Sequence, residues 1–138
     1  MKLKNIPTGN SKEDIKTREK IISDFYYEWK RSNPTQRLFN IDLKDYINIR
    51  HISIIETVEH AARTYLSTLA VLQLDSILTM AKKVRIVNVK PKDKNQNQFE
   101  KMIKMEYELG GIGKVSLIVG VKRSNKEKVQ YCITAIKT

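Results

Sequence analysis

Cysteine and glycine are scarce in this chain of 138 residues, which has one cysteine and five glycines. The single cysteine, Cys132, cannot form an internal disulfide, and it lies in an apolar segment typical of a small buried side chain. Three of the glycines fall in Gly110-Gly-Ile-Gly113, between two expected strands, which favours a hairpin turn over a phosphate-binding loop.

Long apolar runs are also missing, and none reaches the roughly 18 residues that a bilayer-spanning helix needs. The basic N-terminus is not followed by the apolar segment of a secretory signal. We therefore expect a water-soluble, cytoplasmic protein with no membrane partner.

Acidic residues are few, 15 against 26 Lys and Arg, which leaves a formal net charge of +11. The excess is uneven, because residues 82–138 hold 14 basic and 5 acidic side chains, whereas residues 34–81 hold 4 and 5. Such a basic region attracts phosphate backbones with little regard to sequence. RNA or another nucleic acid is the expected partner. An acidic protein partner, or lysines that only maintain solubility, are the alternatives.

The length fits a single domain spanning 1–138, with no internal repeat. Residues 1–10 are expected to be a flexible tail, 11–81 to be mainly helical and 82–138 to form an antiparallel sheet. A helix should begin at the N-cap Ser11 and end at Asn33-Pro34. Its apolar stripe contains Ile15, Ile22, Phe25, Tyr26 and Trp29. Residues 35–52 indicate a short edge strand or an extended loop.

Ser53-Ile-Ile-Glu56 matches a capping box, which predicts a helix from about Ile54. The apolar side of this helix should be Ile55, Val58, Ala62, Tyr65 and Leu69, and its polar side Glu56, His60, Arg63 and Ser67. A second helix, apolar nearly all round, should start near Ser67 and form the buried centre.

From Lys82 the apolar period changes to two, and four alternating segments predict a four-stranded antiparallel β-meander. Helices followed by strands indicate the α+β class, with the N-terminal helices packed on one face of the sheet. The other face should then present Lys104, Lys114, Ser116, Lys122, Gln130 and Thr134.

Glu56 and His60 lie one helical turn apart, an arrangement that suits proton transfer. The alternative is that Glu56 belongs to the capping box and His60 is an ordinary, half-exposed helix residue. The chain has two histidines and no paired cysteines, so we expect no metal and no cofactor.

Two stretches resemble domains of the ribonuclease superfamily that includes barnase, EndoU, the tRNA-cutting colicins and RelE, as found in phage and bacterial mobile-element proteins. One is the helix from Ser53 through His60 to Ala62. The other is the ending Val115-Ser-Leu-Ile-Val-Gly-Val-Lys-Arg123 with Val129-Gln-Tyr-Cys-Ile-Thr134. The resemblance covers about residues 50–138, although the predicted sheet has no histidine.

The resemblance implies a toxin-like endoribonuclease that cleaves RNA without a metal. His60 would act as base or acid, Ser53 and Thr134 would hold a phosphate, and Arg63 or Lys122 would counter its charge. Other backbone contacts are expected from Lys104, Lys114 and Arg123. A non-enzymatic module that binds nucleic acid or an acidic protein remains the alternative.

Overall fold

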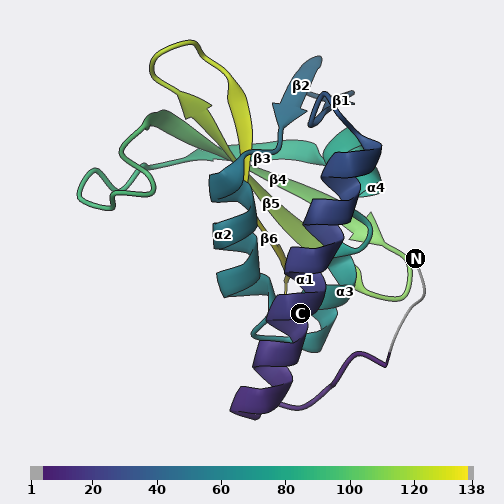
Figure 1. The fold of residues 1–138 in the computed structure, drawn as a ribbon. Coiled ribbons are helices and arrows are strands. Elements are labelled where there is room, and N and C mark those ends of the chain that lie inside the picture. Colours follow the sequence, from purple (N-terminus) through teal and green to yellow (C-terminus); the bar gives the residue numbers. More distant parts are fainter. Residues whose placement is uncertain (1–4, 137–138) are drawn as a thin grey trace.

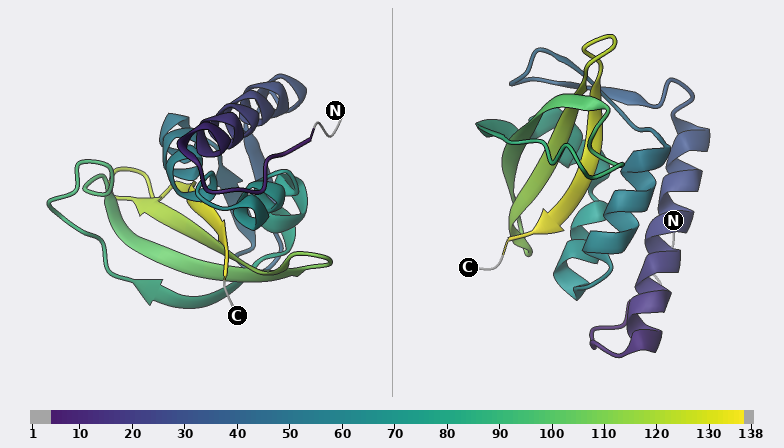
Figure 2. Two further views of the ribbon diagram at one scale, coloured as in Figure 1. Left: turned by 90° about the horizontal axis from the view of Figure 1, so that it is seen from below. Right: turned by 90° about the vertical axis from the view of Figure 1, so that its left-hand side faces the viewer.

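The computed structural model describes residues 5–136, in which four helices pack against a six-stranded sheet (Figure 1). The helices are α1 (Lys12–Ser32), α2 (His51–Ala61), α3 (Tyr65–Val71) and α4 (Leu74–Met80). The strands are β1 (Arg37–Asn40), β2 (Asp45–Asn48), β3 (Lys82–Val87), β4 (Phe99–Leu109), β5 (Gly113–Lys122) and β6 (Lys128–Ala135). Figure 2 shows that the sheet is strongly curled and that the helices gather on one side of it. Among the described residues, no helix is long and apolar enough to cross a membrane.

The α+β class is confirmed, but the predicted sheet is incomplete. Strands β3 to β6 pair antiparallel in chain order, as a meander. Strands β1 and β2 form a hairpin that extends the sheet beyond β6, and β2 runs parallel to β6 through the pair Asn48 and Val129. The sheet is therefore six-stranded and mixed. Both hairpin strands fall in residues 35–52, where a short edge strand or an extended loop was expected within the mainly helical segment 11–81. Each hairpin strand has only four residues, too short a pattern to separate from a loop in the sequence.

The main core lies between the sheet and the helices, and strand alternation brings the expected side chains into it. These include Ile103, Met105, Val115, Leu117, Val119, Val121 and Ile133. A smaller apolar cluster lies on the opposite side of the strands and consists of Phe99, Met102, Val129 and Tyr131 with Ile52, Ile118 and Cys132 packed against it. The sheet therefore buries side chains on both of its faces.

A β-bulge in β6 overturns one prediction. Ile118 pairs with Cys132 but Val119 pairs with Gln130, so Tyr131 is an extra residue in the ladder. Gln130, expected on the open face, is consequently fully buried on the helix side. Its Oε1 accepts from the Tyr26 hydroxyl at 2.6 Å, and its Nε2 donates to Thr57 at 2.8 Å.

Helix α2 is rotated from the expected orientation. Its buried residues include Ser53, Thr57 and Glu56, whereas Ile55 is exposed. It begins at His51, and Ser53 is not the N-cap: the Ser53 hydroxyl, three residues into the helix, accepts from the backbone N–H of Arg50 at 3.0 Å. The core supplies polar partners to this face, so burial of these groups carries little penalty.

Residues 5–10 are not a loose tail, because the fully buried Arg18 of α1 holds them. Its NH1 donates to the carbonyl oxygens of Pro7 at 2.8 Å and Gly9 at 2.7 Å. Its Nε donates to Ala62 O at 2.8 Å and its NH2 to Arg63 O at 3.4 Å, where α2 ends. The rest of the predicted tail, 1–4, lies outside the described residues.

Strand β3 is one edge of the sheet, and its side chains are exposed apart from the half-buried Val87. Val84 and Ile86 alternate with Lys83 and Arg85, and the pairing with β4 shifts register between Lys83 and Arg85. The backbone N–H of Lys83 donates to the carboxylate of Asp42 at 2.8 Å. The hairpin turn before β2 therefore reaches the start of β3.

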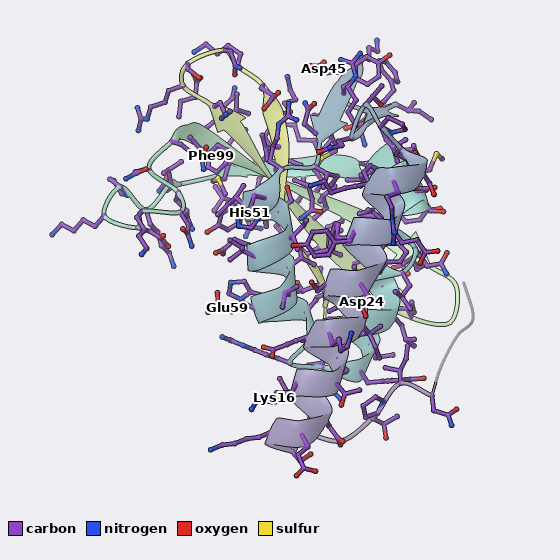
Figure 3. All side chains as sticks on the ribbon, viewed as in Figure 1. Lys16, Asp24, Asp45, His51, Glu59 and Phe99 are labelled. Carbon is purple, nitrogen blue, oxygen red and sulfur yellow. The ribbon has the colours of Figure 1, made fainter. Side chains whose placement is uncertain are left out.

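Arg18→Ala should lower the free energy of unfolding by about 3 kcal/mol, because four carbonyl oxygens, one buried and three partly buried, would lose their donor. Urea unfolding measures this loss. Lys16→Ala, on an exposed position of the same helix (Figure 3), should change stability by less than about 0.5 kcal/mol. Equal effects of the two substitutions would contradict the assigned role of Arg18.

Candidate functional site

An open groove of about 770 Å³ lies where the end of α2 meets the start of β5 and the end of β6. Four of the predicted site residues line it: His60, Arg63, Lys114 and Thr134. Tyr65 at the start of α3 also lines it, and Thr8 and Asn10 of the N-terminal segment complete its wall. Residues more than 70 positions apart in the sequence thus meet in one depression.

His60 occupies the last turn of α2, and its side chain is 37% exposed. Its Nε2 lies 3.4 Å from Oε1 of Glu56 and 3.9 Å from Oε2 of Glu59. The imidazole therefore has one nitrogen facing two carboxylates. This arrangement suits a group that accepts and releases a proton at the mouth of the groove.

The Glu56 carboxylate is held from two other parts of the chain, and its side chain is only 5% exposed. Asn95, in the loop between β3 and β4, donates to its Oε2 at 2.8 Å. Burial and a hydrogen bond with Glu56 raise the pKa of Tyr131, the bulge residue of β6. Glu56 is therefore not part of a helix cap. It is a fixed carboxylate that orients His60.

Glu56, Glu59 and His60 also offer ligand atoms within 4.8 Å of one another. A nitrogen with carboxylate oxygens is a donor set that Zn²⁺ accepts. The two Glu56 oxygens, however, already face His60 and Asn95. The Glu56 oxygen that accepts from Asn95 is therefore already engaged and is not free to bind a metal.

The other predicted residues, Ser53, Lys104, Lys122 and Arg123, do not line the groove. Ser53 is fully buried, so its hydroxyl is not presented to a phosphate at the surface. Lys104 and Lys114 flank Glu106, with Nζ to carboxylate distances of 3.7 and 3.5 Å. Lys122 and Arg123 lie at the far end of β5, about 26 Å from Lys114 along the strand. The predicted cations therefore form two separate groups.

The two side chains that hold Glu56 were missed in the sequence. Asn95 lies in a segment that reads only as a polar loop, and Tyr131 reads as an ordinary strand residue. Local sequence carries no sign that this loop folds back on α2. Glu59, directly before His60, was available as a titratable neighbour in the sequence but was not singled out.

Comparisons with protein-family models, with curated proteins and with solved structures gave no match to this chain. They add nothing to the ribonuclease resemblance. Any function assigned to the groove must be argued from its own geometry.

Stability should fall in alkali as the side chains of Cys132, Tyr26 and Tyr131 are forced to ionise. Burial and the Glu56 charge raise the pKa of the Cys132 thiol to about 12 from an ordinary 9.0. Burial also raises the pKa of Tyr26 and Tyr131 above the ordinary 10.0. These groups favour the folded state fully below pH 9, and the benefit is lost as pH rises from 9 towards 12, because the unfolded chain ionises first.

Urea unfolding across this pH window should show a loss of about 1 kcal/mol per pH unit from each such group. Cys132→Ala should make the decline shallower between pH 9 and 12. An unchanged pH profile in this variant would show that the thiol does not titrate with folding.

Proposed function

We propose that this protein binds RNA and cleaves it without a metal at the groove beside His60. The observation that supports the proposal is the meeting of His60, Arg63, Lys114 and Thr134 around one open depression. Cleavage of a phosphodiester bond requires a group that transfers protons and groups that stabilise charge on the phosphate. Here the imidazole is the first, and two cations and a hydroxyl are the second. The net charge of +11 favours a polyanionic substrate.

In the proposed reaction the ribose 2′-oxygen loses a proton and attacks phosphorus. The bond to the 5′-oxygen breaks, and that oxygen takes up a proton. The products are a 2′,3′-cyclic phosphate and a 5′-hydroxyl end. His60 performs one of the two proton transfers. Arg63 and Lys114 counter the charge that builds on the phosphate, and the Thr134 hydroxyl donates to one of its oxygens.

The second proton transfer falls to Glu59 in this proposal. Its carboxylate lies 3.9 Å from the imidazole, and its side chain is 58% exposed, so it is accessible to a bound strand. Glu56 stays out of the chemistry because it is buried and hydrogen-bonded. It keeps the imidazole in place.

A module that binds RNA without cleaving it is the second candidate. It is favoured by the pairing of both groove cations, because Arg63 lies 4.0 Å from Glu59 and Lys114 lies 3.5 Å from Glu106. His60 is also the only histidine among the described residues that line the groove. Binding without cleavage would establish this second function.

His60→Ala should abolish cleavage of labelled RNA in the presence of EDTA, with a loss of at least about 100-fold, because one proton transfer would lose its group. Binding and folding should be unchanged. The measurement is the amount of 2′,3′-cyclic phosphate ends formed from total RNA.

His51→Ala is the matched control, since His51 is an exposed histidine at the opposite end of the same helix (Figure 3). It should cleave like the original protein. Cleavage that survives in His60→Ala, or that EDTA removes, would contradict the proposed mechanism.

RNA affinity should fall steeply with salt, linearly in log[salt], with a slope of about −0.7 for each phosphate contacted on a single strand. Lys114→Ala should make the slope shallower by about one phosphate contact. Fluorescence anisotropy of a labelled strand measures both quantities. A flat salt response would point to a protein partner instead.

A further inference from the structure

The β1–β2 hairpin carries an aromatic surface that the groove does not use. Phe39 and Tyr46 are directly opposite each other on the two strands and are 46% and 41% exposed. Their rings meet edge to face, with centroids 5.4 Å apart. The guanidinium carbon of Arg37 lies 4.0 Å from the centre of the Tyr46 ring. We call these three residues the hairpin platform.

The hairpin is anchored through its other face. Ile47 and Asn40 are fully buried, and the Asn40 amide donates to the carbonyl oxygens of Leu78 and Ala81 at 2.8 and 3.0 Å. An ion pair of 2.7 Å between Asp45 and Lys128 ties β2 to β6. Cross-strand aromatic pairs do stabilise hairpins, but this anchoring does not require a platform that remains about half exposed.

The charges around the platform favour an anionic ligand. Arg37 and Lys44 form no ion pair with any side chain that the structure describes. The two carboxylates of the hairpin are both engaged, Asp45 by Lys128 and Asp42 by the backbone N–H of Lys83 at 2.8 Å. Exposed rings with a guanidinium stacked on one of them and a lysine nearby match the bases and phosphates of an unpaired strand, because bases stack on aromatic and guanidinium planes while cations meet the backbone. An apolar protein surface would gain nothing from the unpaired cations.

We propose that the hairpin platform binds the unpaired bases of a single-stranded RNA by stacking. The identity of the strand as RNA rests on the function proposed above. The platform lies beyond the N-terminal end of α2 and the groove lies at its C-terminal end (Figure 1). Helix α2, which lies between them, is about 16 Å long.

The test measures the affinity of the protein for two polyanions, by direct binding of a labelled ligand or by competition. One is an oligouridine, and the other is inorganic polyphosphate, which carries negative charges but no bases. The double variant Phe39→Val and Tyr46→Thr replaces both aromatic residues with β-branched residues, which also favour strands, so the hairpin should persist. Its affinity for oligouridine should fall at least about 10-fold, because stacking on the two rings is lost. Its affinity for polyphosphate should stay within about twofold of the original.

Tyr27→Ala is the matched control, because Tyr27 is 51% exposed on α1 and belongs to no platform. It should bind both polyanions like the original protein. The unsubstituted protein offers a second measurement. NMR follows the ring-proton resonances of Phe39 and Tyr46 as oligouridine is added. Stacked bases should shift both rings, and polyphosphate should not.

Unchanged oligouridine affinity in the double variant, or equal losses for both polyanions, would overturn the platform while leaving RNA binding intact. Failure of the original protein to bind oligouridine at all would overturn both proposals. Binding without cleavage would remove only the nuclease mechanism, and the ring shifts would still establish the platform.

Discussion

The buried guanidinium of Arg18 is the constraint on which the groove depends. It is fully buried, and its donors are matched to four carbonyl oxygens, two from the N-terminal segment and two from the end of α2. A cation at the C-terminus of a helix also complements the helix dipole. Thr8 and Asn10 adjoin the acceptors Pro7 and Gly9, and Arg63 is itself an acceptor. Because these three residues line the groove, one side chain of α1 holds two of the groove's walls together.

The second organising feature is the polar inner surface of α2. Thr57 engages Gln130, and Glu56 engages Asn95 and Tyr131, so hydrogen bonds replace the usual apolar seam on this side of the helix. Hydrogen bonds are directional, and a satisfied buried network specifies a single orientation of the elements that share it. The orientation of His60 at the end of α2 follows from this network.

The sequence predicted those helices and strands that depend on neighbouring residues, such as a helix with its own capping residue. Helix α1 begins after its N-cap Ser11, whose hydroxyl accepts from the backbone N–H of Asp14, and it ends before Pro34. The bulge at Tyr131 and the rotation of α2 depend on contacts between distant segments, so neither could be predicted from alternation or helical period. For the site, His60 and Arg63 share a helix end that spacing predicts, but only the fold brings Lys114 and Thr134 beside them.

The basic residues of the edge strand β3 affect self-association of the protein. An open strand edge with exposed Val84 and Ile86 is a template for pairing with another sheet. Lys83 and Arg85 would be brought against identical cations in such a pair, and the register shift between them disturbs the ladder. Repulsion of this kind is screened within about 10 Å at 0.1 M salt. Lys83 and Arg85 therefore protect this edge from pairing with a second sheet most strongly at low ionic strength, and salt weakens that protection.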